Sequence, residues 1–441
     1  MQQTKFNLKK LLPVVCGLVI CAVPMLWPTG LSVEGHGVYS GDLTASLWAK
    51  IRAIYPTSQP PVELTAVTKF KQRLTAEGRD LKMHGVYVET LDTRESLVAY
   101  NEGALFNPAS VMKIVTSIAA LDKLGANYRF RTEFRAHGEI NAKTGELNGD
   151  LIVVSGSDPA FSIKDANTAG AALRKLGIQR VTGNLIVAGS FTCNENAQTD
   201  ISAGVLRRNL GLTIRGTTEL ANDRRDELPG HKLLTIESAA LLHLLQEQNA
   251  RSVNAMADAV GEVIGGADAV KKFLVERIGL KAEEVYISRA SGLETNRLTA
   301  WGTAKMLRGV FDWLNANGYK PEDLMPIAGI DPSTVGGRFT EPEFAGSVIA
   351  KTGTLHETDN GAANLAGIAY TKAKGAILFV IYDMAEGRNV THLRGVQDEF
   401  LKNLMNELGG PNPVRQRATT TSTIAAKEIT ESRILITDTT E

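Results

Sequence analysis

The stretch Asn107-Pro108-Ala109-Ser110-Val111-Met112-Lys113 predicts the start of a buried helix that carries a serine and a lysine on one face. Asn107 is a favourable N-cap and Pro108 a favourable first helical residue. The apolar positions that follow continue to Leu124, and Gly125 then ends the helix. Because Ser110 and Lys113 are three residues apart, their side chains share a helix face. A lysine buried beside a serine hydroxyl can lose its proton and act as a base.

A second motif, Ser252-Val253-Asn254, follows an apolar helical segment. In an extended loop, alternate residues point the same way, so Ser252 and Asn254 would both face one cleft. There the hydroxyl can relay a proton to a leaving amine, and the amide can hold substrate and lysine. The alternative is an ordinary N-cap for the helix that begins at Ala255.

The third motif, Lys351-Thr352-Gly353-Thr354, ends a strand-like run that begins at Ser347. The lysine supplies a charge for a carboxylate, Thr352 adds a hydroxyl, and Gly353 allows close approach of a substrate backbone. By itself this motif also fits a strand-to-turn junction, and S-x-x-K alone is expected about once by chance in a chain of this length. All three motifs in this order predict a serine enzyme that transfers acyl groups.

Composition limits the other classes of function. The 441 residues include 48 basic and 48 acidic side chains, and this zero net charge gives no support for nucleic-acid binding. Lys5, Lys9 and Lys10 precede an apolar run over 11–27, which predicts an export signal or an N-terminal anchor. We therefore expect a periplasmic or extracytoplasmic protein, secreted or associated with the membrane through this segment.

Cysteine and histidine patterns predict neither a disulfide nor a metal site. Cys16 and Cys21 lie in the expected signal, which leaves Cys193 alone in the mature chain. The histidines are scattered without the paired spacing of metal ligands, and no glycine-rich phosphate loop is present. We expect no metal and no cofactor.

The pattern of apolar, polar and glycine residues along the chain predicts two folded regions. We expect a signal or anchor at 1–29, a linker at 30–61 with a short helix near 43–55, and a disordered tail at 411–441. A mostly β insertion over 127–234 separates the two parts of the main domain, 62–126 and 235–410. Within the insertion, 149–154 and 183–188 are similar at an offset of 34, which is either a strand-level repeat or a chance likeness.

At these motifs the chain resembles the class C penicillin-binding proteins, the D-Ala-D-Ala carboxypeptidase/endopeptidase family. The resemblance covers roughly 62–408 and includes Asn107 to Ser110, Gly149-Asp150-Leu151, Asp158-Pro159 and Lys351 to Leu355. It implies an α/β (α+β) fold: a β-lactamase/transpeptidase-like domain with an antiparallel sheet flanked by helices, plus an inserted domain. It also implies peptidoglycan stem peptides as substrates and β-lactam antibiotics as ligands.

The resemblance implies a role for each motif residue. Ser110 is the nucleophile and Lys113 its base, Ser252 and Asn254 complete the catalytic set, and Lys351, Thr352, Gly353 and Thr354 bind substrate. The backbone N–H groups of Ser110 and Thr354 would form the oxyanion hole.

The sequence departs from the family pattern at three places. The insertion is short, Val253 replaces the usual Asp or Asn, and Arg289 begins a segment that usually reads Asp-Gly-Ser-Gly-Leu. Two alternatives stay open: a degenerate protein that binds the cell wall without catalysis, and a β-lactamase that uses Glu294 and Asn296.

Overall fold

The computed structural model describes residues 63–141, 143–221, 228–414 and 431–437. The signal or anchor at 1–29, the linker at 30–61 and its helix near 43–55 lie outside the described residues. Among the helices within those four ranges, none has the length and apolar character needed to cross a membrane.

The main domain is built on a five-stranded antiparallel sheet in the order β12-β13-β14-β1-β2. Alternating apolar residues predict the β1–β2 hairpin, and the long apolar runs of β13 and β14 mark central strands covered on both faces. The strands are β1 (His84–Thr90), β2 (Ser96–Tyr100), β12 (Val348–Leu355), β13 (Ala362–Thr371) and β14 (Gly375–Met384).

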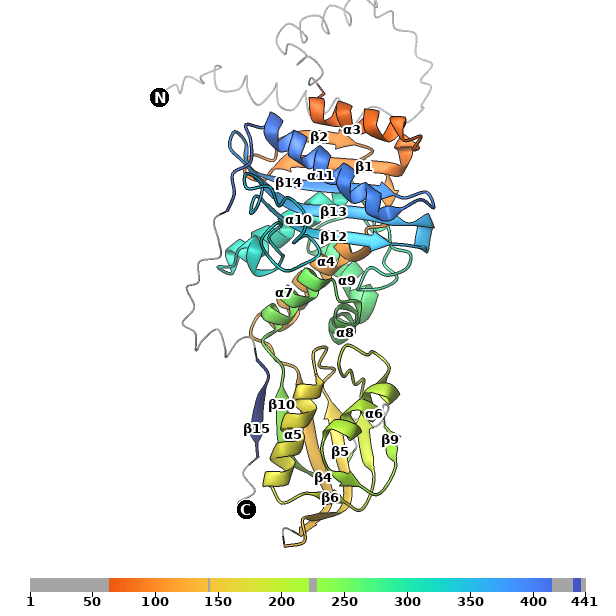
Figure 1. Cartoon of the computed structure of the whole chain (residues 1–441), viewed down its shortest axis with the longest axis vertical. Helices are drawn as coiled ribbons and strands as arrows, with labels where there is room; N and C mark the ends of the chain where they lie inside the picture. Colours follow the sequence, from red (N-terminus) through yellow and green to blue (C-terminus); the bar gives the residue numbers. More distant parts are fainter. Residues whose placement is uncertain (1–62, 142, 222–227, 415–430, 438–441) are drawn as a thin grey trace, which may run out of the picture. The chain divides into compact units, whose positions relative to one another are not determined.

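Helices cover both faces of this sheet (Figure 1). On one face α11 (Val390–Glu407) packs against β13 and against α3 (Thr65–Ala76). On the other, α10 (Ala300–Ala316) packs against β14 and β1. The predicted α/β (α+β) fold, an antiparallel sheet flanked by helices, is therefore confirmed.

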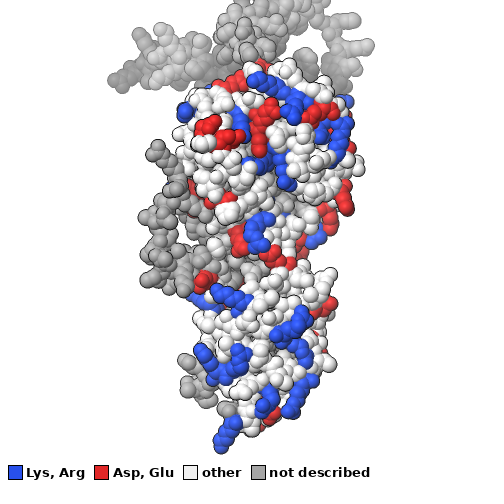
Figure 2. Space-filling model, viewed as in Figure 1, with Lys and Arg blue, Asp and Glu red and all other residues white. Residues whose placement is uncertain are grey.

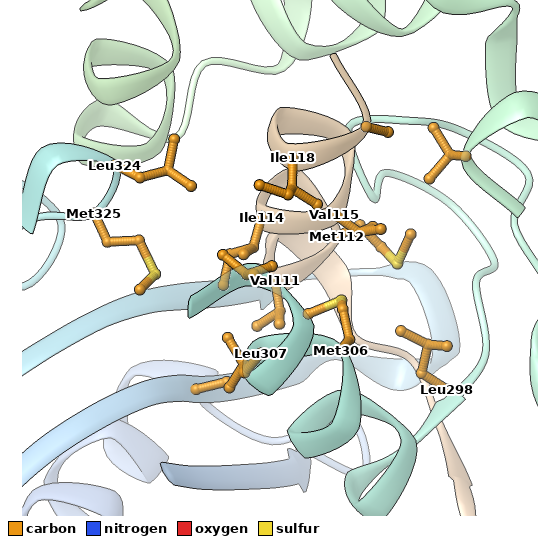
Figure 3. Packing of buried hydrophobic residues seen from close by; sticks show 14 of the residues in the cluster. Val111, Met112, Ile114, Val115, Ile118, Leu298, Met306, Leu307, Leu324 and Met325 are labelled. Carbon is orange, nitrogen blue, oxygen red and sulfur yellow. The ribbon is translucent and has the colours of Figure 1, made fainter. Parts of the chain in front are cut away.

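The helix that contains Lys113 of the first motif lies inside a large apolar core. This helix, α4 (Met112–Leu124), ends at Gly125 with φ +83°, as the sequence predicts. Figure 3 shows its apolar side chains, among them Ile114 and Ile118, packed against residues of α10 and the segment at 324–325. The helices α7 (Leu241–Arg251), α8 (Asn254–Ile264) and α9 (Gly266–Glu276) complete this layer. The buried packing of α4 fixes the position of Ser110 in the turn that directly precedes this helix.

The inserted region has its own sheet and its own core. Two helices that the sequence analysis did not name, α5 (Ile163–Lys175) and α6 (Thr199–Asn209), pack on this sheet. Its main strands are β4 (Arg131–Asn141), β5 (Glu146–Ser155), β7 (Leu185–Ala188), β9 (Thr218–Leu220) and β10 (His231–Glu237). The sequence pattern predicts a helix over Ile236–Gln248, but β10 continues to Glu237, so α7 begins only at Leu241.

The two similar segments of the insertion are adjacent parallel strands. Leu151 pairs with Leu185 and Val153 with Val187, which is the offset of 34 seen in the sequence. The Asp150 carboxylate accepts a hydrogen bond from the Asn184 backbone N–H at 2.7 Å. At the next strand the Asn184 side chain accepts one from Thr217 N–H at 2.9 Å. The likeness is therefore a structural repeat, and β9 adds a third strand to it.

The tail does not match the expectation of disorder over 411–441. Residues 433–436 form β15, which pairs antiparallel with the edge of β10. Arg433 Nε donates to the buried Glu237 carboxylate at 2.6 Å, and Ile434 packs against the core of the insertion. The expectation was wrong for this segment because four residues are too short to show a periodic pattern, while an open strand edge offers backbone partners. The parts 415–430 and 438–441 lie outside the described residues.

Basic side chains are prominent on the face of the insertion that Figure 2 shows. Among the basic residues of the insertion, Arg135 is paired with Glu133 at 2.7 Å and Arg180 with Glu146 at 3.2 Å. These pairs are partly exposed, so they contribute little to stability.

Candidate active site

Ser110 is presented by a tight turn that precedes the regular helix. Residues Ala109–Val111 form a 3-10 turn, η4, and α4 begins only at Met112. The Asn107 side chain accepts a hydrogen bond from Ala109 N–H at 3.1 Å, which is the capping role that the sequence predicts. Ala109 has φ +50°, a left-handed conformation that is unfavourable for a residue with a Cβ. Strain of this kind clusters at functional sites, and here it directly precedes the serine.

Lys113 is the hub of the site. Its side chain is fully buried. Its Nζ lies 2.9 Å from Ser110 Oγ, 2.6 Å from Asn254 Oδ1 and 2.7 Å from the Ser291 carbonyl oxygen. A neutral amine has two N–H donors and one lone pair. The contacting atoms, Asn254 Oδ1 and the Ser291 carbonyl oxygen, can only accept, so they take the two donors and leave the lone pair facing the hydroxyl of Ser110. This arrangement suits a base that accepts the proton of Ser110.

Burial lowers the pKa of Lys113 to about 7. The Asp258 carboxylate opposes this shift, whereas the Arg289 guanidinium adds to it. A base with a pKa near neutrality is half deprotonated at the pH where most enzymes work, which favours proton transfer.

The second motif lies at a sharp junction between helices, not in the extended loop that we expected. Ser252 is the C-cap of α7 with φ +59°, and Asn254 is the first residue of α8. The left-handed turn directs Ser252 Oγ to within 2.8 Å of Lys351 Nζ. Asn254 instead contacts Lys113. The motif therefore joins the two lysines of the site.

The Lys351 side chain lies inside the protein, where its amine contacts other groups of the chain. Its side chain is fully buried, and its Nζ donates to the Ser252 hydroxyl and to the Thr352 carbonyl oxygen at 2.9 Å. Burial, together with the nearby charge of Lys113, holds the pKa of Lys351 well below its usual range. Thr352 Oγ1 donates to Thr334 Oγ1 at 2.8 Å.

The edge of β12 provides backbone donors beside Ser110. On its outer side, Val348 accepts a bond from Ala328 and Ala350 donates one to Pro326. In an antiparallel strand the N–H and C=O of one residue point to the same side. Thr354 has the same parity as these two residues, so its N–H also points outward.

Gly353 brings this strand edge close to the nucleophile turn. A Cβ at Gly353 would lie 2.4 Å from the Pro108 carbonyl oxygen and 3.2 Å from Ala109 Cβ. Only glycine permits this approach, which brings the end of β12, with the outward N–H of Thr354, beside the turn that holds Ser110. Two converging N–H groups are the usual construction of an oxyanion hole.

Arg289, one of the three departures from the family pattern, is part of an ion pair beside Lys113. Arg289 Nη2 donates to Asp258 Oδ2 at 2.5 Å, and Asp258 Oδ1 accepts the backbone N–H of Ser291 at 2.9 Å. Since the carbonyl of Ser291 accepts from Lys113, the pair helps to position the base.

Some residues of the site were missed by the sequence analysis. Asp258 lies four residues after Asn254 on α8, so its position on the same helix face could have been predicted. Thr334 and Arg394 reach the site from a loop and from α11, and no local pattern indicates them.

A serine paired with a buried lysine, beside a lysine on a sheet edge, is the arrangement shared by penicillin-binding proteins and serine β-lactamases. Within that class, the family model of the D-Ala-D-Ala carboxypeptidase 3 (S13) family matches residues 67–204 and 197–404. The chain belongs to this family.

Curated relatives and solved structures agree with this assignment. The chain is 34% identical over 116 residues to a D-alanyl-D-alanine carboxypeptidase of an Actinomadura species, which covers 26% of this chain and 21% of the relative. It is 28% identical over 103 residues to a carboxypeptidase of Haemophilus influenzae, covering 23% of this chain and 21% of the relative. These alignments thus span about a fifth of the curated relatives.

Similarity to solved structures extends further along the chain. A predatory peptidoglycan endopeptidase from Bdellovibrio bacteriovorus matches with a TM-score of 0.64 at 20% identity, covering 80% of this chain and 98% of that one. Penicillin binding protein 4 of H. influenzae matches with a TM-score of 0.61 at 21% identity, covering 78% and 99%. At such identities the match shows the shared fold.

Proposed function

We propose that this protein is a serine-type D-Ala-D-Ala carboxypeptidase that cleaves peptidoglycan stem peptides through an acyl-enzyme on Ser110. The observation that carries the proposal is the contact between Lys113 Nζ and Ser110 Oγ at 2.9 Å, made by a buried lysine whose pKa is about 7. Membership of the S13 family supports the same reaction. A cell-wall substrate also places the enzyme outside the cytoplasm, either free or held by the N-terminal segment.

The reaction begins when Ser110 Oγ attacks the carbonyl carbon of the penultimate D-Ala and its proton passes to Lys113. The N–H groups of Ser110 and Thr354 stabilise the negative charge on the carbonyl oxygen. The C–N bond then breaks as Ser252 gives its proton to the leaving amine and takes back a proton from the Lys113 ammonium, which returns Lys113 to its neutral form. Water finally hydrolyses the ester. Asn254 orients Lys113 and the substrate, and Lys351 holds Ser252 in place from within.

The same chemistry also accommodates a DD-endopeptidase activity, in which the leaving amine belongs to a cross-linked side chain. A related endopeptidase of B. bacteriovorus has been solved in a form acylated by penicillin G. Incubation with a free pentapeptide and with a cross-linked dimer separates the two activities by their products.

A β-lactamase function has less support from the arrangement of Glu294 and Asn296. The Glu294 side chain is exposed and paired with Arg289 at 3.2 Å. Asn296 is buried and accepts a hydrogen bond from the backbone N–H of Ser288 at 3.0 Å. Both side chains are therefore engaged in local structure and not in holding a water at Ser110.

Labelling with a fluorescent penicillin tests the proposal. We expect a stable covalent adduct that maps to Ser110, no adduct in Ser110→Ala, and full labelling in Ser117→Ala. Ser117 is a control on the same helix; its hydroxyl donates to the Lys113 carbonyl oxygen and accepts from Gln248 and Asn249, so thermal unfolding checks that this variant is folded. An adduct on another residue would refute the assignment of the nucleophile. A labelled protein that fails to turn over any D-Ala-D-Ala peptide would favour the non-catalytic alternative.

A further inference from the structure

The sheet of the insertion has one face that α5 and α6 leave uncovered. Phe134 and Ala136 of β4 point into the core to which these two helices contribute. Because side chains alternate along a strand, Arg131, Glu133 and Arg135 lie on the opposite face. All three line a cavity of about 780 Å³. Pockets that bind small ligands measure roughly 300–1,000 Å³, so this cavity has room for a short peptide.

Two arginines and one glutamate form a row across three strands in the wall of this cavity. Glu237 of β10 lies opposite Arg131 of β4 and opposite Arg433 of β15. One carboxylate oxygen of Glu237 accepts from Arg131 Nε at 2.9 Å, and the other accepts from Arg433 Nε at 2.6 Å. Only 1% of the Glu237 side chain is exposed. The buried glutamate therefore fixes the orientation of both guanidinium groups.

Both arginines keep donors for a ligand. Each bonds to the protein through its Nε, and among the described residues the Nη groups of Arg131 and Arg433 have no hydrogen-bond partner. Their side chains are 68% and 57% exposed. A guanidinium has five N–H donors, so most of those on each arginine remain available. The row is thus a pair of oriented cations that are open to the cavity.

The charges around the row favour an anionic ligand. The residues that line the cavity include four arginines and three glutamates. Of these glutamates, Glu237 is covered by the arginine pair, and Glu133 is bound to Arg135 at 2.7 Å and to Lys232 at 3.8 Å. Glu262 of α8 is the third, and it is exposed. Basic groups therefore outnumber acidic ones, and the acidic groups nearest the row are already neutralised.

We infer that this cavity binds an acidic stem peptide of peptidoglycan, distinct from the one cleaved at Ser110, through carboxylates that contact Arg131 and Arg433. The inference rests on the proposed peptidase function and extends it to a second binding site. Neighbouring strands are about 4.8 Å apart, so the backbones of the two arginines are about 10 Å apart. Since the Glu237 carboxylate lies between the guanidinium groups, two separate carboxylates fit this row better than one doubly charged phosphate.

A second site would hold the enzyme on its polymeric substrate. Peptidoglycan presents the same stem peptide many times, so a peptide bound at the insertion raises the local concentration of others at Ser110. One arginine of the site belongs to β15, the strand formed by the C-terminal segment. Pairing of this segment with β10 therefore completes the site.

A titration on the full chain tests the second site alone, after penicillin has acylated Ser110 and blocked the active site. The probe is a synthetic stem tripeptide, L-Ala-γ-D-Glu-L-Lys, which has free carboxylates on its glutamate and at its end and lacks D-Ala-D-Ala. Its diamide and inorganic phosphate are titrated in parallel. The variants are Arg131→Gln and Arg433→Gln, each of which leaves Glu237 one arginine. Arg208→Gln is the control, because Arg208 is exposed on α6, which packs on the other face of the sheet.

We expect the tripeptide to bind to the acylated wild type and the diamide to bind far more weakly. Arg131→Gln and Arg433→Gln should each weaken tripeptide binding about 10-fold, whereas Arg208→Gln should match wild type. Added salt should also weaken binding. If thermal unfolding shows that a glutamine variant is misfolded, Arg131→Lys replaces it, and its affinity should lie between those of wild type and a protein without the charge.

Three results would overturn the inference. They are no tripeptide binding to the acylated wild type, equal affinity in wild type and both arginine variants, and tighter binding of inorganic phosphate than of the tripeptide. In a protein that labels normally with penicillin, each of these results leaves the proposed peptidase function intact. A wild-type protein that forms no penicillin adduct would instead overturn the proposed function.

Discussion

The pH dependence of acylation should follow the protonation of Lys113, because only the neutral amine can accept the proton of Ser110. With a pKa of about 7, the neutral fraction is about one tenth at pH 6 and about nine tenths at pH 8. The rate constant for penicillin acylation should therefore rise about tenfold over this range and level off above it.

The ion pair beside Lys113 provides opposite perturbations of this profile. Arg289→Ala removes a positive charge and should raise the pKa of Lys113, which moves the rising limb to higher pH. Asp258→Asn removes a negative charge and should move the limb to lower pH. Its amide oxygen can still accept from Ser291 N–H, so the backbone beside Lys113 stays supported.

Labelling with fluorescent penicillin is stopped after set times at each pH between about 5.5 and about 9.5. The acylation rate constants then give one pH profile each for wild type, Arg289→Ala and Asp258→Asn. Arg277→Ala is a control because that arginine pairs with Asp122 at the surface, at 3.1 Å. A flat profile, or a limb that moves in the same direction in both variants, would refute the assignment of Lys113 as the base.

Three further predictions follow from particular contacts. Gly353→Ala places a Cβ 2.4 Å from Pro108 O and should slow penicillin acylation on the order of 100-fold, whereas Gly337→Ala, with open space around it, should not. Truncation after Val414 removes β15 from β10 and should cost about 1–3 kcal/mol; a melting temperature equal to that of the full chain would show that the strand contributes nothing. Burial raises the pKa of Asp158 to about 7, so the carboxyl of the native protein stays neutral at pH values where that of the unfolded chain ionises. The free energy of unfolding should therefore decrease as the pH rises from about 4 to about 7. Asp158→Asn should therefore stabilise the protein by up to about 3–4 kcal/mol at pH 8 and hardly at pH 4, as measured by thermal unfolding at both values.

Local patterns predict individual strands and helices of the main domain, whereas the antiparallel sheet flanked by helices is what the family resemblance implies. Helix α4 ends at Gly125 as predicted, and α8, β13 and β14 match their apolar runs closely. The sequence does not predict the left-handed conformations of Ala109 and Ser252, since the surrounding packing imposes them.

Contacts between distant segments are the other part that could not be predicted. A lysine is a suitable ligand for a carboxylate, yet Lys351 is buried and bonded to Ser252. Both features depend on helices that are distant from Lys351 in the sequence. In the same way β15 has no periodic signal of its own, because its stability comes from the free edge of β10.

The repeated strands of the insertion have a consequence for how this region can change in length. Asp150, Asn184 and Thr217 form successive steps, in which a side chain on one strand binds the backbone of the next. Each step adds one parallel strand at an interval of about 33–34 residues. A sheet built in this way can gain or lose a whole strand, with its connecting segment, at its free edge without disturbing the other strands. Insertions of different size can therefore be tolerated while the sheet beneath Ser110 keeps its geometry.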